Sequence, residues 1–271
     1  MAAKGISKLQ GVSGAEVVNP LPAFGGAEPE SIEAALERIP GELRRRDRAV
    51  TAGDFQELAL ATPGASVGRA ECLPRFHPPT RTPERAGIVS VVVWPQEDKR
   101  NPNAPLPDRN LLRAVCEWLD RRRLVTTELY VIPPTYRRVA VSVGLAVKPG
   151  YGIEAVRRWV ELVLRQYLAP LPPYGPDGKG WPLGRRVHGP ELEAAALQVE
   201  GVEFLEDLRV AGWNEATQQW VPGTVTLAMY EVPHLAELTV VEGTPPAPGD
   251  AIGAPPSDAV AIPIPVIRQE C

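Results

Sequence analysis

The chain has 271 residues, of which 44% are hydrophobic, which is enough for one large domain or two small ones. Its formal net charge is −4, and without a general basic field nucleic acid is not an expected partner. No apolar run approaches the ~20 residues that span a bilayer. The N-terminus also has no apolar signal core, so we expect synthesis in the cytoplasm and no membrane insertion.

The first 30 residues are expected to form an extended arm. They end in N-P-L-P-A-F-G-G-A-E-P-E at positions 19–30, where three prolines and two adjacent glycines disfavour regular structure. Because Pro29 is favourable in the first turn of a helix, a helix is predicted from there to about Arg38.

The sharpest local signal is a helix start at V-T-A-G-D-F, positions 50–55. Thr51 is the expected N-cap, and Asp54 stands where it can close a capping box. Val50 and Phe55 occupy the positions of a hydrophobic staple. The rest of this first unit is predicted as a strand near 65–74, a buried strand over 88–93, a helix over 107–120 and a strand near 125–132.

The second unit opens with the cleanest alternation in the chain. One face of this predicted strand carries valine and leucine from Val139 to Val147, and the other carries Ala140, Ser142, Gly144 and Ala146. The small residues indicate that something packs closely on their face. Further elements are predicted as an amphipathic helix over 152–168, a short helix over 190–199, and strands near 202–210, 224–232 and 236–241.

These elements predict an α+β chain with two small sheet-and-helix units. The expected divisions are an extended arm or linker over 1–30, a first unit over 31–134, a second unit over 135–241 and a proline-rich tail over 242–271. The tail has seven prolines and one basic residue, so it buries little by itself and is expected to be disordered or bound to a partner.

An ordered set of segments resembles the C-terminal half of the baseplate J-like proteins, the putative baseplate assembly proteins of contractile phage tails and contractile injection systems. The resemblance implies a structural wedge protein that joins neighbours around a tail hub, without catalytic residues or cofactors. Its implied partners are other baseplate or wedge subunits, a second copy of the chain, and hub, spike or sheath-proximal proteins. The segments are N-P-L-P-A-F-G-G-A-E-P-E at 19–30, R-R-R-D-R-A-V-T-A-G-D-F-Q-E-L-A at 44–59, A-E-C-L-P at 70–74, G-I-V-S-V-V-V-W-P at 87–95, L-D-R-R-R-L-V-T-T at 119–127, G-P-D-G-K-G-W-P-L-G-R at 175–185 and V-E-G-V-E-F-L-E-D-L at 199–208.

Family members usually carry a large N-terminal half before the N-P-L-P-A segment. Here 18 residues precede that segment. We therefore expect either a short member of the family or a separately encoded N-terminal half, assembled into a phage tail or an injection-system particle.

Interface candidates follow from two features of the sequence. Apolar side chains on proline-rich ends need a cover, and arginine is enriched at protein interfaces. The candidates are Leu21, Phe24, Arg44, Arg45, Arg46, Arg48, Trp181, Ile262 and Ile264.

The alternative is a tail-associated hydrolase or a small-ligand-binding module that uses the glycine-rich loop 175–184. Asp177 and Lys179 give this loop polar groups, but it lacks a phosphate-binding G-x-x-x-x-G-K-[ST] pattern. A turn-rich loop anchored by Trp181 is the competing interpretation. The three histidines are isolated in sequence and no metal-binding or nucleophile-elbow motif is present, so we expect no metal, no cofactor and no enzymatic activity.

Overall fold

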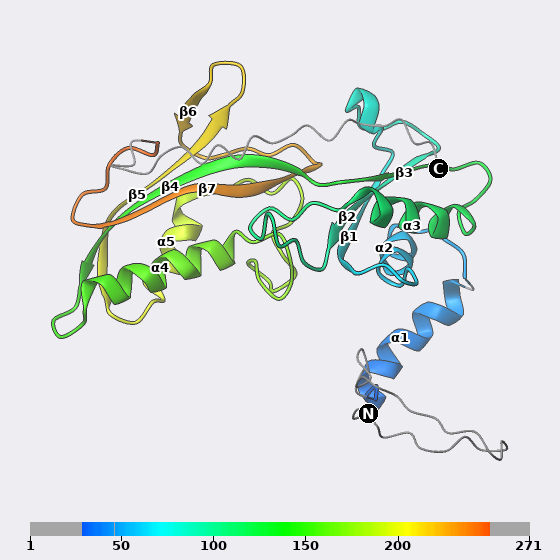
Figure 1. Ribbon diagram of the computed structural model, residues 1–271, viewed down its shortest axis with the longest axis horizontal. Coiled ribbons are helices and arrows are strands. Elements are labelled where there is room, and N and C mark those ends of the chain that lie inside the picture. The colour runs from blue at the N-terminus through cyan, green and yellow to red at the C-terminus, as the bar shows by residue number, and fades with distance from the viewer. Residues whose placement is uncertain (1–28, 46, 250–271) are drawn as a thin grey trace, which may run out of the picture. The chain divides into compact units, whose positions relative to one another are not determined.

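The computed structural model describes residues 29–45 and 47–249 (Figure 1). The predicted arm up to residue 28, with Leu21 and Phe24, lies outside the described residues, as do Arg46 and the tail from residue 250, with Ile262 and Ile264. The described residues fall into two compact units, one that ends at Asp47 and one that begins at Arg48.

The described chain combines helices with two separate β-sheets (Figure 1). This arrangement confirms the predicted α+β class. In chain order the elements are α1 (Ile32–Arg45), α2 (Ala52–Leu60), β1 (Val67–Pro74), the 3-10 turn η1 (Pro78–Thr80), β2 (Ile88–Pro95), α3 (Arg109–Asp120), β3 (Glu128–Ile132), β4 (Thr135–Val147), α4 (Ile153–Tyr167), α5 (Gly189–Leu197), β5 (Val202–Asn214), β6 (Gln219–Pro222) and β7 (Glu231–Glu242).

Helix α1 runs well past its predicted end at Arg38. It contains Pro40, a residue that usually breaks a helix because it lacks the N–H group and crowds the preceding turn. Arg38 pairs with Glu42 at 2.7 Å, which bridges the position of the proline. The apolar spacing also continues to Leu43, so the pattern on either side outweighs one unfavourable residue.

The first sheet has the order β1-β2-β3, with β1 antiparallel and β3 parallel to the central strand β2. Helices α2 and α3 pack against it, and Phe55 is buried in the core that they share with the sheet. The predicted capping box is confirmed, because Thr51 Oγ1 accepts from the Asp54 N–H at 3.2 Å and Asp54 accepts from the Thr51 N–H at 2.7 Å. Val50 is 57% exposed, so it adds little to the predicted staple.

The second sheet has the order β6-β5-β4-β7, with β7 parallel to β4 and the other neighbours antiparallel. Helices α4 and α5 cover one face (Figure 1). The core there contains the alternating side chains predicted for β4, namely Val139, Val141, Val143 and Leu145. We call this the inner face and the opposite one the outer face.

The predicted strand near 224–232 is wrong. Pro222 ends β6, and Gly223 follows with a φ of 116° that L side chains rarely adopt. Val225 then forms an isolated bridge with Val187 and is buried in the core. The apolar character of this segment thus reflects a buried connection, and β7 begins only at Glu231.

Candidate assembly surfaces and the contact between the two sheets

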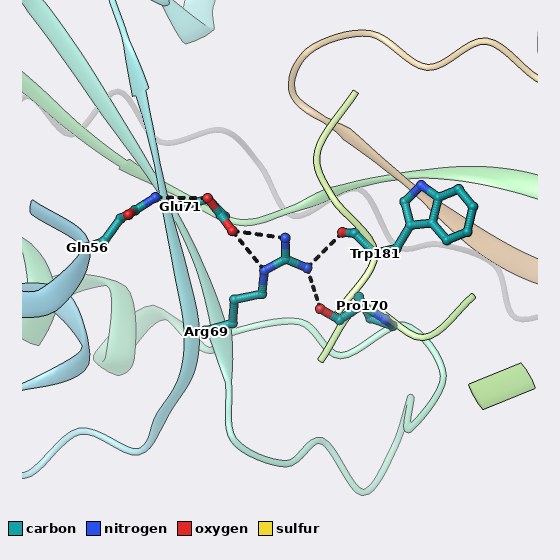
Figure 2. Close-up of polar contacts among 5 residues, drawn as sticks. All are labelled: Gln56, Arg69, Glu71, Pro170 and Trp181. Carbon is teal, nitrogen blue, oxygen red and sulfur yellow. Dashed lines mark hydrogen bonds and ion pairs between the residues drawn. The ribbon is translucent and has the colours of Figure 1, made fainter. Parts of the chain in front are cut away.

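Arg69 of β1 joins the first sheet to the loop that follows α4, the helix that packs on the second sheet (Figure 2). Its Nη1 atom donates to the carbonyl oxygens of Pro170 at 2.6 Å and Trp181 at 2.8 Å. The side chain is only 6% exposed. A buried guanidinium needs hydrogen-bond acceptors and a countercharge, and this contact provides both.

The countercharge is Glu71, two residues along the same strand. Its Oε1 atom accepts from Nε of Arg69 at 3.2 Å and from Nη2 at 3.0 Å, while Oε2 accepts from Gln56 of α2 at 2.8 Å (Figure 2). The guanidinium also lies 4.8 Å from the ring centroid of Trp94, a geometry that adds cation–π attraction. The network therefore links α2, β1 and β2 to the loop after α4.

The glycine-rich loop is built around Trp181. This indole is fully buried, and its Nε1–H donates to the carbonyl of Arg185 at 2.9 Å. Gly180 has a φ of 80°, and a Cβ at this position would lie 2.1 Å from the Pro170 carbonyl oxygen, so only glycine fits. The geometry matches the interpretation of Trp181 as an anchor, and a partner at this loop would have to meet its exposed residues, which include Asp177 and Lys179.

A surface groove lies beside this loop but does not involve its buried tryptophan. Its lining includes Gln96, Leu162, Arg165, Leu171 and Tyr174. Apart from the hydroxyl of Tyr174, the side chains that line it are amides, one guanidinium and apolar groups.

The three histidines lie in different places. His77 contacts Thr80 through Nδ1 at 2.6 Å, and His188 lies 3.4 Å from the hydroxyl of Thr224. His234 of β7 packs edge-on against Tyr136. Within the described residues no group of three or more His, Cys, Asp and Glu side chains could hold a metal ion.

Helix α1 carries an apolar seam on its exposed surface. Ile32, Leu36, Ile39 and Leu43 are 76%, 67%, 42% and 71% exposed. Their spacings of four, three and four residues are those of the a and d positions of a heptad repeat. Such a seam is typical of a helix that packs against other helices.

The structure places the other predicted interface residues as follows. Arg44 and Arg45 lie in the last turn of α1, and Arg48 is exposed in the segment between α1 and α2. The sequence analysis overlooked both Arg69 and the α1 seam. The heptad spacing would have revealed the seam, whereas no local signal distinguishes Arg69 from the other arginines.

Comparison with known proteins shows a likeness in fold. No family profile matches the sequence, and a search of curated proteins finds no match. The fold is similar to that of a chain in the cryo-EM structure of the anti-feeding prophage (AFP) baseplate, 6-fold symmetrised, with a TM-score of 0.59 and 18% sequence identity. The match covers 87% of this chain and 47% of that one, so the chain spans about half the length of the AFP protein, and at this identity the likeness shows a shared fold.

In the part of the chain that the structure describes, no helix is both long enough and apolar enough to cross a membrane.

Proposed function

We propose that the chain is a structural, non-enzymatic component of the baseplate of a contractile, phage-tail-like injection machine, in which it acts as a wedge protein between neighbouring subunits. The observation that carries the proposal is the fold shared with the AFP baseplate chain over 87% of this chain. The ordered segments that resemble baseplate J-like proteins point in the same direction.

The seam on α1 supports a role in assembly. The helix has 14 residues, a length at which an isolated helix is marginal in water. Pro40 and Gly41 cost about 3 and 1 kcal/mol relative to alanine inside a helix. A helix with this sequence is stabilised when other helices cover its apolar side, which is the situation of a subunit inside an assembly.

The identity of the seam residues favours a bundle. In the heptad frame Ile32 and Ile39 take the d positions, and Leu36 and Leu43 take the a positions. Leucine at a with isoleucine at d shifts the preference from two strands to three or four. Glu33 and Glu42 flank the seam at e and g, so partner helices with basic flanks are favoured over identical ones.

The test is incorporation of the chain into particles. Leu36→Ala combined with Ile39→Ala removes the middle of the seam, while Glu37→Ala changes an exposed acidic position of the same helix that neither belongs to the seam nor flanks it. Both changes keep or raise helix propensity, so loss of the helix cannot explain a difference between them. The variants would be expressed with the remaining particle genes, and the chain would be quantified in purified particles.

We expect the seam variant to be lost from particles and the acidic variant to be retained, with the same melting temperature for both isolated chains. Equal retention of the two variants would remove the seam from the proposal. Absence of the unmodified chain from any tail-like particle would contradict the proposed function itself.

A further inference from the structure

Helix α4 presents a second apolar surface, on a side turned away from its own core. The buried residues of this helix pack on the second sheet, whereas Trp159 is 59% exposed and Leu162 is 42% exposed. Ala155 is exposed one turn before them and Gln166 is half-buried one turn after. We call these four residues the α4 stripe. Their spacings of four, three and four residues are those of the seam on α1 and of the a and d positions of a heptad.

The α4 stripe leads into the surface groove at the C-terminal end of the helix. Leu162 and Gln166 line this groove together with Tyr174, which is 44% exposed. Tryptophan and tyrosine are enriched at protein interfaces and among the residues that dominate binding energy. The stripe and the groove therefore form one open surface with aromatic anchors.

One flank of the α4 stripe is basic. Arg158 and Arg165 take the g positions of its heptad frame, and both are exposed. Within the described residues neither forms a salt bridge, and Glu154, one turn before Arg158, pairs with Arg157 at 2.8 Å. An apolar stripe with free positive charges on its flank is complementary to an apolar helix face with acidic flanks.

The seam on α1 has this complementary chemistry. The seam over 32–43 and the stripe over 155–166 share their spacing and have the same length, about 17 Å at ~1.5 Å per residue. Glu33 and Glu42 flank the seam at its e and g positions. Glu42 also contacts Arg38 at 2.7 Å, but both side chains are 47% exposed, and an exposed pair of this kind is readily exchanged for another.

We propose that the α1 seam of one copy of the chain packs on the α4 stripe of a second copy. The two surfaces are different, so the contact is heterologous: each copy uses its seam toward one neighbour and its stripe toward the next. A contact of this type closes into a ring or extends into a filament. The inference rests on the proposed assembly role of α1 and names the partner of its seam.

Two variants with complementary defects test the contact in the purified chain. Leu36→Ala combined with Ile39→Ala disables the seam and leaves the stripe, whereas Trp159→Gln disables the stripe and leaves the seam. Sedimentation velocity over a range of concentrations measures self-association. We expect the unmodified chain to associate and each variant alone to show a Kd that is higher by about tenfold or more. An equimolar mixture should form a dimer and nothing larger, because it offers one intact seam to one intact stripe.

A matched control and a charge reversal make the test specific. Leu197→Gln removes an apolar side chain of similar exposure, 51%, from α5, and it should leave the association unchanged. Arg158→Glu with Arg165→Glu makes the stripe acidic and should weaken association. Glu33→Lys with Glu42→Lys makes the seam basic and should weaken it as well. A mixture of these two chains should recover association, since opposite charges again face each other in every contact, and recovery also shows that both chains are folded.

An unmodified chain that stays monomeric at every concentration would overturn the proposal. Association of Trp159→Gln or of the seam variant as strong as that of the unmodified chain would overturn it too, and so would the absence of a dimer in their mixture. These measurements contain no other particle protein, so their failure leaves the incorporation test of the proposed function intact. Absence of the chain from particles, in turn, does not alter the self-association of the purified chain.

Discussion

Replacing Arg69 by alanine removes the polar contact between the first sheet and the loop of the second. The carbonyl oxygens of Pro170 and Trp181 would lose a donor that lies 2.6 and 2.8 Å away. Each buried acceptor left without a partner costs about 1–3 kcal/mol. Glu71 is one-third exposed and keeps its bond from Gln56, so it adds little to this cost.

The expected loss of unfolding free energy for Arg69→Ala is therefore about 2–6 kcal/mol. Arg69→Lys should fall between this variant and the unmodified chain, because one ammonium group cannot reproduce the planar fork or its stacking on Trp94. A matched control exists on β5, where Arg209 pairs with Asp207 at 2.7 Å with the same two-residue spacing. Both side chains of that pair are more than 40% exposed, so Arg209→Ala should cost at most about 1 kcal/mol.

Urea denaturation measures these differences through the midpoint and the slope of the transition. Besides the shift in midpoint, Arg69→Ala should separate the transition into two steps, since the contact couples the two sheets. If Arg69→Ala and Arg209→Ala shift the midpoint equally, the buried network does not stabilise the chain as its geometry implies.

Three further predictions concern the cap of α2, one histidine and the glycine-rich loop. Thr51→Ala should lower the unfolding free energy by about 0.5–2 kcal/mol by loss of the cap, and Phe55→Ala by about 3–5 kcal/mol; equal and negligible shifts in denaturant melts would contradict both. Burial, aided by the nearby positive charges of Arg138 and Arg165, lowers the pKa of His234 below its usual value of 6.5. The neutral imidazole therefore contributes stability above pH 6.5, and this contribution is lost as the pH falls through the folded-state pKa. His234→Gln should reduce this acid-side loss, measured as melting temperature against pH, and an unchanged profile would argue against it. Replacing Asp177, Lys179 and His188 by alanine should leave any measured hydrolase activity of the chain unchanged. A loss of that activity would favour the enzymatic alternative.

Elements with a strong period were predictable from the sequence alone. The alternation on β4 and the capping signal before α2 identified both elements, because each depends on neighbours in sequence. The end of α1 was not predictable by the same route, since Pro40 is a correct local stop signal that the surrounding ion pair and seam override. The strand expected near 224–232 failed for a related reason, because burial of Val225 produces the same apolar pattern as a strand.

Contacts that depend on distant segments left little trace in the sequence. Arg69 lies more than 100 residues from both carbonyl groups that it binds, and no local pattern encodes that distance. The small residues on β4 did signal a close neighbour, and Gly144 meets one at Gly243 and Pro245. Small residues predict that another segment packs closely against them, but they do not identify that segment.

The seam of α1 and the contact of Arg69 differ in whether the same chain supplies their binding partners. Arg69 finds acceptors, a countercharge and an aromatic face within its own chain. The four seam residues of α1 are still 42–76% exposed, and at about 1.5–3 kcal/mol for each fully exposed side chain their remaining burial would contribute roughly 4–8 kcal/mol together. That gain exceeds the cost of about 4 kcal/mol from Pro40 and Gly41 only when most of the seam is covered. A helix balanced in this way is stable inside a bundle and weak outside it, which makes its formation conditional on the partner and suits a subunit whose place is defined by its neighbours.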